Sequence, residues 1–339
     1  MPAKNFFDLQ PHDVMIACEK LGLQPTGEFF QLNSYENRVF DIKLEEPILL
    51  NEEMDDFFKS NVNTSSVIAK FYRPNRWSKA CIQEEHNFLT DLALDGIPAV
   101  LPLAFDQKTV FEHEGIYIAL FPKVRGKMPD ELNKNNFVQI GGLIARLHNV
   151  GARKPSIHRP VMNTNYYGGW PTLSDLSSLI APEVSHRYKI AAETILYAYE
   201  DLCDGFDREF FHRIHGDAHR GNLLSTGAAT GSSFFMLDFD DFGMGPAVQD
   251  FWMLFSGEGE ELEEQKELLL QGYEEFRDFD DAQWDLILPL RGMRIISYAG
   301  WIAKRWDDPS FPKIFPEFGS YKYWAEETEE LEKIARLLG

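Results

Sequence analysis

The sequence predicts an α+β fold, with a small β-rich N-terminal unit carrying one main helix and a larger, mainly helical C-terminal unit. Up to about residue 122, apolar residues fall in short runs rich in valine, isoleucine and phenylalanine, which is typical of strands. From about residue 136 they recur every three or four positions, the period of an α-helix. A chain of 339 residues is long enough for two units with buried cores. We therefore expect units at residues 1–122 and 123–339.

The N-terminal unit should begin with a helix, because apolar residues follow Pro11 at helical spacing. Two strands are expected next, since the polar stretch NSYEN at 33–37 separates two apolar runs. A second helical period ends at Gly96, a residue that commonly stops a helix. The expected order is a helix at 11–23, two strands within 27–44, a loop at 51–66, a strand at 65–72, a helix at 77–96, and strands at 100–105 and 115–122.

The C-terminal unit shows helical periodicity over most of its length, with one exception. Between residues 213 and 246, two short apolar runs flank a Gly/Ser-rich turn, which predicts a hairpin with polar residues at its ends. The expected helices lie around residues 136–150, 184–202, 246–256, 260–278, 282–306 and 322–338.

Composition restricts the classes of partner and compartment. A formal net charge of -21 argues against a nucleic-acid partner, because phosphate-backbone binding relies on a basic face. The three cysteines lack CxxC spacing and cannot close a disulfide framework, which favours a reducing compartment. No apolar run approaches the length of a membrane helix, and the N-terminus lacks the apolar core of a signal peptide. We expect a cytoplasmic monomer without a membrane partner.

Three polar residues near the predicted hairpin form a pattern with chemical meaning. In HGDAHRGN, Asp217 precedes Asn222 by five positions, and Asp238 follows 21 residues after Asp217 on the far side of the hairpin. Phosphoryl transfer needs mainly positioning and charge neutralisation, so one carboxylate suffices to orient an acceptor hydroxyl. A carboxamide and a second carboxylate are oxygen ligands suited to Mg²⁺, with nucleotide phosphates and water completing its octahedron. The hairpin should bring Asn222 and Asp238 together.

This pattern resembles the aminoglycoside-phosphotransferase/choline-kinase-like kinases, and more closely the family of bacterial stress response kinase A. HGDxxxxN alone indicates the broader group, whereas other segments are more specific. These segments are LNSYENRVF at 32–40, KFYRP at 70–74, HRP at 158–160, GPAVQDFWML at 245–254 and FPKIFP at 311–316. The resemblance implies a bilobal protein-kinase-like fold and an ATP- and Mg²⁺-dependent protein Ser/Thr kinase linked to stress responses.

The resemblance also implies roles for residues in the C-terminal unit. Asp217 corresponds to the catalytic base, and Asn222 and Asp238 correspond to the magnesium ligands. His215 corresponds to the structural histidine of the catalytic loop. Asp250 corresponds to an acidic residue that accepts hydrogen bonds from the backbone of that loop.

In the N-terminal unit, Lys70 falls where such kinases place the lysine that contacts the α and β phosphates. Its partner is expected on the following helix, where Glu84 and Glu85 compete for the role and the spacing to Gly96 favours Glu85. Adenine is expected at the junction of the two units, against backbone groups of Phe121 to Val124.

The stretch NSYEN stands where many kinases have a Gly-rich loop, so Asn33 or Ser34 would cover the nucleotide instead. The resemblance also makes Ser34 a candidate autophosphorylation site, although a turn-forming hydroxyl is the simpler role. His148 is expected to pack in the core. Asp240 and Asp241 would either assist the metal or face solvent.

Two other functions fit the sequence. The same motif and the acidic charge permit a small-molecule kinase of the aminoglycoside, choline or homoserine type. A nucleotide-binding scaffold without turnover is a third hypothesis, and the complete set of polar residues in the motif argues against it.

Overall fold

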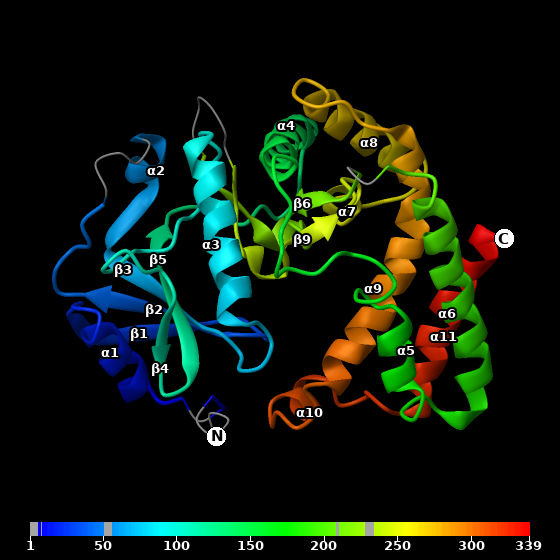
Figure 1. Cartoon of the computed structure of the whole chain (residues 1–339), viewed down its shortest axis with the longest axis horizontal. Coiled ribbons are helices and arrows are strands. Elements are labelled where there is room, and N and C mark those ends of the chain that lie inside the picture. The colour runs from blue at the N-terminus through cyan, green and yellow to red at the C-terminus, as the bar shows by residue number, and fades with distance from the viewer. Residues whose placement is uncertain (1–5, 8, 51–55, 208–209, 228–233) are drawn as a thin grey trace.

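The computed structural model describes residues 6–7, 9–50, 56–207, 210–227 and 234–339, and it confirms the α+β fold class (Figure 1). The helices are α1 (Pro11–Glu19), α2 (Asp56–Asn61), α3 (Lys79–Leu94), α4 (Lys134–Gly151), α5 (Trp170–Leu176), α6 (Pro182–Cys203), α7 (Gln249–Trp252), α8 (Glu260–Tyr273), α9 (Ile287–Ala303), α10 (Phe311–Ile314) and α11 (Tyr321–Leu338). The strands are β1 (Pro25–Leu32), β2 (Arg38–Leu44), β3 (Val62–Phe71), β4 (Phe111–His113), β5 (Ile116–Val124), β6 (His212–Ile214), β7 (Leu223–Ser225), β8 (Phe234–Met236) and β9 (Gly243–Gly245).

The first five strands form one antiparallel sheet in the order β1-β2-β3-β5-β4. Alternate residues of β3, Val67 and Ala69 among them, are fully buried on one face of this sheet. They belong to the same apolar cluster as Val14 and Cys18 of α1, so α1 covers this face. Because successive side chains of a strand point to opposite faces, the other residues of β3 lie on a second face, which can carry polar functional groups.

The second face of β3 carries Lys70, which lies directly opposite Ala119 of β5 in the sheet register. Helix α3 covers this face, because its Ile82 packs in one cluster with Ala119. Ser78 begins α3 by accepting a hydrogen bond from the N–H of Cys81 at 3.2 Å, as an N-cap residue does. Figure 1 shows α3 standing between the sheet and the helices of the C-terminal half. The fold thus directs Lys70 toward α3.

The C-terminal half is built on packed helices, with α4 against α8 and with α6, α9 and α11 against one another. Two short antiparallel pairs, β6–β9 and β7–β8, accompany these helices, and Figure 1 shows β6 and β9 next to α7. Among the described residues, no helix is both long enough and apolar enough to cross a membrane. The core of this half includes Ile140, Ile144, Tyr188, Ile195, Leu290, Met293 and Trp324, all fully buried.

Two expectations for the N-terminal half are wrong. Residues 100–105 form no strand, and the edge strand is instead β4 (Phe111–His113). Pro102 lies inside the expected run and lacks the N–H that a sheet ladder requires. The expected loop at 51–66 also contains α2 and the start of β3 at Val62, while residues 51–55 lie outside the described part of the chain.

Helical periodicity predicted some helices of the C-terminal half to be longer than they are, and it did not predict two short ones. The helix expected at 246–256 is only four residues long, Gln249–Trp252, because turns occupy the rest of that segment. Helices α5 and α10 were not expected, since four to seven residues are too few to display a period. The Gly/Ser-rich turn expected between β7 and β8 falls largely on residues 228–233, outside the described residues.

The packing of α4 against α8 generates the first prediction. A Cβ atom added at Gly141 of α4 would lie 2.0 Å from the carbonyl oxygen of Leu269 in α8, whereas one at Gly142 would meet nothing closer than 3.2 Å, the ring of Phe276. Gly141→Ala should lower the free energy of unfolding by about 2 kcal/mol, because overpacking outweighs the gain of about 1 kcal/mol in helix propensity. Urea denaturation measures it.

Gly142→Ala is the matched control, because it has the same gain in helix propensity and its Cβ would stay 3.3 Å from the nearest backbone atom, the carbonyl oxygen of Gly272. Equal stabilities of the two variants would show that the close approach of α4 and α8 does not require glycine at 141.

Candidate functional site

The carboxylate of Asp250 organises the segment that links β6 to β7. Its Oδ2 accepts the backbone N–H of His215 at 2.7 Å, and its Oδ1 accepts that of Gly216 at 2.8 Å. His148 is fully buried, with its Nε2 3.0 Å from Asp250 Oδ2 and its Nδ1 3.0 Å from the hydroxyl of Tyr273. Desolvation by burial lowers the pKa of His148 despite that carboxylate. Asp250 thus accepts hydrogen bonds from the loop backbone, and His148 packs in the core.

His215 fixes the position of the loop relative to β8. Its Nε2 lies 2.8 Å from the carbonyl oxygen of Leu237, and its Nδ1 accepts the backbone N–H of Asp217 at 3.3 Å. The ring is fully buried beside Phe239. These contacts hold both sides of the hairpin in place and leave His215 no free nitrogen for chemistry.

Asp217 lies between two basic side chains. Arg294 Nη1 of α9 donates to Asp217 Oδ1 at 3.0 Å, and His219 Nε2 lies 3.4 Å from Oδ2. Because His219 Nδ1 accepts the N–H of Gly221 at 2.9 Å, the ring proton is on Nε2 and faces Asp217. Burial favours the neutral acid, but the hydrogen bond from His219 and the charge of Arg294 hold the pKa of Asp217 below its usual value. The carboxylate is therefore ionised at neutral pH and suited to orient a hydroxyl.

The hairpin brings Asn222 and Asp238 to the same end of β7 and β8. Leu223 pairs with Met236, and the N–H of Leu237 donates to the carbonyl oxygen of Asn222 at 2.8 Å. Asp238 adopts a left-handed conformation with φ 60°, which turns its side chain out of the strand and leaves it 53% exposed. Both predicted ligands therefore lie at one edge of the site.

The donor set fits a divalent cation that also binds nucleotide phosphates. Asn222 Nδ2 donates to the carbonyl oxygen of Asp217 at 2.9 Å, so its Oδ1 stays available as a ligand, and Asp238 supplies an exposed carboxylate. Within the described residues, no group of three or more His, Cys, Asp and Glu side chains could hold a metal ion by itself. Two protein ligands with phosphates and water are the arrangement that Mg²⁺ favours in such sites.

Lys70 is a buried cation surrounded by carboxylates. Its Nζ lies 3.1 Å from Asp238 Oδ1, 3.1 Å from Asp240 Oδ1 and 3.8 Å from Glu85 Oε1. Burial alone would lower the pKa of Lys70, but the charges of Asp238 and Asp240 raise it well above its ordinary value. The ammonium group therefore remains charged.

Glu85 and Glu84 have different partners. Glu85 is buried beside Lys70, and its Oε2 accepts a hydrogen bond from Arg159 Nη2 at 2.9 Å. Glu84 points toward the segment after α4, where it accepts the backbone N–H groups of residues 157, 158 and 159. Only Glu85 of the two therefore lies beside Lys70, the position that the spacing to Gly96 favours.

Arg159, which the sequence reasoning did not single out, connects α3 to the loop after β8. Its side chain is fully buried, and its Nη1 donates to the carbonyl oxygen of Asp240 at 2.7 Å while Nη2 reaches Glu85. The guanidinium lies between the rings of Trp77 and Phe242, at 4.4 Å and 4.6 Å from their centroids. In the sequence, the sign that could have pointed to Arg159 was its place in the HRP segment at 158–160.

Asp240 is committed to protein contacts. It is buried, and it pairs with Lys70, with Arg76 and with Asn37, whose Nδ2 lies 3.1 Å from Oδ2. The charge of Arg76, followed by that of Lys70, holds the pKa of Asp240 below its usual value against the effect of burial. Asp241 also pairs with Arg76. Burial contradicts the solvent-facing alternative for Asp240, whereas the Asp241 side chain is 49% exposed, and assistance to a metal stays a prediction for both.

Glu36 fastens the NSYEN turn, residues 33–37, to α9. Its Oε2 accepts a hydrogen bond from Trp301 Nε1 at 2.6 Å and lies 2.5 Å from Arg305 Nη2, while Oε1 lies 3.1 Å from Arg73 Nε. Ser34 Oγ accepts the N–H of Asn37 at 3.2 Å, as a turn-forming hydroxyl does. The loop is thus positioned by side chains.

Phe121 and Val124 lie on the second half of β5. The edge strand β4 pairs only with residues 116–118 of β5, so within the described sheet the later residues pair with β3 alone. Phe121 also packs edge-to-face on His86 of α3, with centroids 5.9 Å apart. This segment is where the chain leaves the sheet toward α4.

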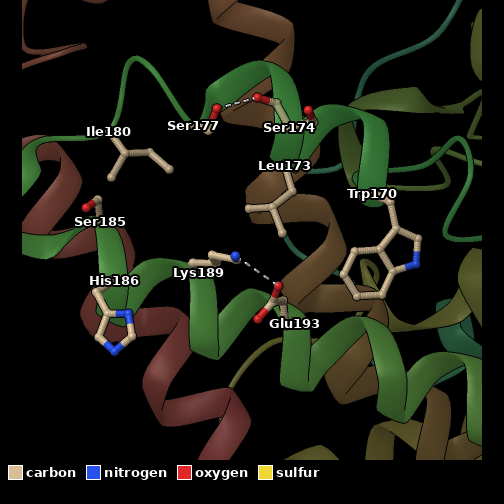
Figure 2. A pocket seen from close by; sticks show the side chains of 9 residues that line it. All are labelled: Trp170, Leu173, Ser174, Ser177, Ile180, Ser185, His186, Lys189 and Glu193. Atoms are coloured by element: carbon tan, nitrogen blue, oxygen red, sulfur yellow. Dashed lines mark hydrogen bonds and ion pairs between the residues drawn. The ribbon is translucent and has the colours of Figure 1, made fainter.

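A pocket of about 550 Å³ lies elsewhere, between α5 and α6, and Figure 2 shows its side chains. Trp170 and Leu173 contribute apolar surface, and Lys189 and Glu193 pair with each other on α6. None of the loop, hairpin or sheet residues described above lines it. The pocket is separate from the site around Asp217.

The chain belongs to the phosphotransferase enzyme family, whose model matches residues 46–287. Within that family it belongs with stress response kinase A: it is 35% identical to the protein of that name from Escherichia coli (strain K12), over 99% of this chain and 95% of that protein. It is also 34% identical to "Serine/threonine protein kinase RdoA" of Salmonella typhimurium (strain LT2), over 99% of this chain and 95% of that protein. The chain is therefore a phosphotransferase of the kinase type.

Solved structures share the fold at lower identity. Amicoumacin kinase, in complex with AMP-PNP, Ca²⁺ and Ami, superposes with a TM-score of 0.69 at 18% identity, covering 96% of this chain and 93% of that chain. The microcompartment-associated aminopropanol kinase gives a TM-score of 0.66 at 18% identity, with 96% of each chain covered. These likenesses confirm the kinase-like fold and say nothing further about the acceptor.

The packing of α3 against the sheet generates a prediction on pH dependence. His86 Nε2 lies 3.3 Å from the Tyr72 hydroxyl and Nδ1 lies 2.8 Å from Thr109 Oγ1. Burial, with the charges of Lys70 and Arg159, lowers the pKa of His86 to about 3. Below an unfolded pKa of about 6.5 only the unfolded chain takes up this proton, so stability falls as pH falls.

His86→Gln removes the titration while keeping hydrogen-bonding capacity. Between about pH 7 and about pH 5.5, the wild-type protein should lose about 1 kcal/mol of unfolding free energy relative to this variant. Urea denaturation of both proteins at the two pH values measures the difference, and a pH-independent difference would show that the pKa of His86 is not depressed.

Proposed function

We propose that this protein is an ATP- and Mg²⁺-dependent kinase that phosphorylates Ser or Thr hydroxyls of proteins in a stress response. The observation that carries the chemistry is that three elements converge: Asp217 on the loop, the Asn222–Asp238 pair on the hairpin, and Lys70 on the sheet. The protein acceptor is supported by 34% identity over nearly the full length to a relative named as a Ser/Thr kinase.

In this proposal the chain forms two lobes with a boundary at about residue 122, and each lobe contributes its own residues to the reaction. Lys70, kept charged by Glu85 and Asp240, binds the α and β phosphates, and adenine lies against the backbone of Phe121 to Val124. Asn222 and Asp238 hold Mg²⁺, which neutralises charge on the phosphates when it is bound. The 53% exposure of Asp238 lets it turn from Lys70 to a metal, whereas buried Glu85 and Asp240 stay with the lysine.

Asp217 orients the acceptor hydroxyl and receives its proton late in the transfer. A loose transition state demands little basicity from this residue, which suits a carboxylate whose pKa is depressed. His215 and Asp250 act through the loop backbone that carries Asp217. We further propose that the protein works as a cytoplasmic monomer.

Ser34 is proposed as an inhibitory autophosphorylation site, which would make the enzyme a phosphoprotein. It lies in the NSYEN turn, next to Glu36, and its hydroxyl closes the turn by accepting the Asn37 N–H. A phosphate there would break this turn and add nearly two negative charges beside those of the nucleotide, which lowers nucleotide affinity.

A small-molecule acceptor is the second candidate, because amicoumacin kinase and aminopropanol kinase share the fold. Incubation with labelled ATP and Mg²⁺, with a general protein acceptor or with a panel of small alcohols, separates the two functions. Label on protein supports the proposal, and label confined to a small alcohol contradicts it.

Asp217→Asn should abolish transfer and leave ATP affinity nearly unchanged, because the side chain faces the acceptor and contacts Arg294 and His219 instead of Lys70. We expect a loss of at least about 100-fold in kcat, at the lower end of general acid–base contributions. Phosphoryl-transfer assays and titration calorimetry with Mg-ATP measure both quantities. Near-normal turnover would remove Asp217 from the acceptor-orienting role.

Asp238→Ala should weaken Mg²⁺-dependent nucleotide binding as well as transfer, since it removes the only formal charge among the proposed metal ligands. Asn222→Ala should act in the same direction but less strongly, because it removes a neutral ligand. Calorimetric titration of ATP with and without Mg²⁺ gives the comparison. If both variants kept the wild-type dependence of nucleotide affinity on Mg²⁺, the metal would have to bind elsewhere.

A further inference from the structure

The segment before α5 is pressed against α9 beside Asp217. A Cβ atom added at Gly168, whose φ is +57°, would lie 1.8 Å from the carbonyl oxygen of Met293. One added at Gly169 would lie 1.7 Å from that of Thr164. Only glycine permits this approach of the two backbones. As a result, Tyr167 is held against the turn of α9 that carries Arg294.

The Tyr167 hydroxyl is a buried polar group at the site. It lies within electrostatic range of Arg294, Asp217 and Asp241, and burial raises its pKa despite the charge of Arg294. Arg294 lies close enough to act on the hydroxyl oxygen as a hydrogen-bond donor, and no described group accepts the hydroxyl's own proton. A buried hydroxyl whose proton has no acceptor is unfavourable, so a ligand oxygen that accepts it gains binding energy.

Arg294 provides further hydrogen-bond donors at the same place. Its Nη1 donates to Asp217 Oδ1 at 3.0 Å, and its side chain is 40% exposed. Apart from Asp217 and the Tyr167 hydroxyl, no residue in the described part of the chain accepts a hydrogen bond from this guanidinium, so some of its N–H groups remain available. Guanidinium is always charged and is a donor only, so the group next to Asp217 attracts oxygen acceptors and repels ammonium groups.

An aromatic wall continues this surface along α9. Tyr298, one helical turn after Arg294, is 47% exposed and stacks on Trp301 with centroids 5.5 Å apart. Phe315 packs against both Tyr298 and the exposed Tyr35 of the NSYEN turn. Rings of this kind supply apolar contact area for an extended chain.

We propose that Tyr167 and Arg294 form an acceptor subsite that selects a hydroxyl flanked by carbonyl or carboxylate oxygens, as in a seryl or threonyl residue of a peptide. The subsite rests on the proposed function and names its substrate class. The Tyr167 hydroxyl and the free N–H groups of Arg294 donate to those oxygens, while Arg294 keeps Asp217 turned toward the acceptor hydroxyl. Amino alcohols and aminoglycosides, which present ammonium groups, are disfavoured at this subsite.

The test compares Tyr167→Phe and Arg294→Gln with the wild-type enzyme, using dephosphorylated casein and 1-amino-2-propanol as acceptors. Tyr167→Phe should raise KM for casein about fivefold, the effect of one neutral hydrogen bond, and leave Mg-ATP affinity unchanged. Arg294→Gln should raise it at least tenfold, because its hydrogen bonds are charge-assisted. It should also lower kcat, because Asp217 loses the side chain that keeps it turned toward the acceptor hydroxyl.

Two substitutions far from the subsite serve as controls. Tyr197→Phe removes an exposed hydroxyl on α6, and Arg187→Gln removes an exposed guanidinium that pairs with Glu332. Thermal denaturation of these four variants and of Arg294→Glu tests that each of the five is folded. Arg294→Glu, which reverses the charge, should lower KM for 1-amino-2-propanol while raising it for casein.

The outcomes separate this proposal from the proposed function. If the wild-type enzyme labels casein and the variants behave as expected, the subsite is supported. If it labels casein but folded Tyr167→Phe and Arg294→Gln keep its KM for casein, the subsite is wrong and the kinase function stands. If it labels only 1-amino-2-propanol, both proposals are overturned.

Discussion

The buried ammonium group of Lys70 is the constraint on which the rest of the site depends. A cation removed from water is tolerated only with opposite charges in contact, and those charges must come from other parts of the chain. Glu85 comes from α3, while Asp238 and Asp240 come from the loop after β8. The charge of one lysine on the sheet is therefore neutralised by side chains from α3 in the N-terminal half and from the loop after β8 in the C-terminal half.

Arginines balance the carboxylates that gather around this lysine. Arg159 pairs with Glu85 and holds the backbone of the Asp240 loop, and Arg76 pairs with Asp240 and Asp241. Each of these pairings joins segments at least 70 residues apart in the sequence, so no local sequence pattern predicts it. Loss of one member would leave its partners buried and unpaired, which is why such networks act as a unit.

The fold and the candidate site differ in how much of each could be predicted from sequence. Regular periods predicted α3, α4, α6 and most strands, because burial on one face determines such elements. The same reasoning placed a strand at residues 100–105 and missed β4, since a three-residue edge strand carries no period. The order and spacing of Asp217, Asn222 and Asp238 could be recognised in the sequence, because the predicted chemistry requires these residue types at set intervals along the chain.

The residues that sequence reasoning missed act through tertiary contacts. Arg294 lies 77 positions from Asp217 in the sequence, within a helix whose pattern predicts only burial. Tyr167 depends on the two glycines that follow it, because Gly168 lies against the backbone of α9 and Gly169 against that of Thr164, and neither contact is apparent in the sequence. Motifs indicate which residues do chemistry, whereas packing decides which residues position them.

Helix α9 connects the loop of Asp217 to the NSYEN turn. Arg294, in the middle of α9, contacts Asp217, while Trp301, two turns later, and Arg305, just beyond the end of the helix, hold Glu36 of that turn. A Gly-rich loop would approach phosphates through its backbone and remain pliable, whereas this turn is fastened by its side chains. Because Arg294 and Trp301 belong to the same helix, the position of α9 determines both where the Asp217 carboxylate is held and where the NSYEN turn lies.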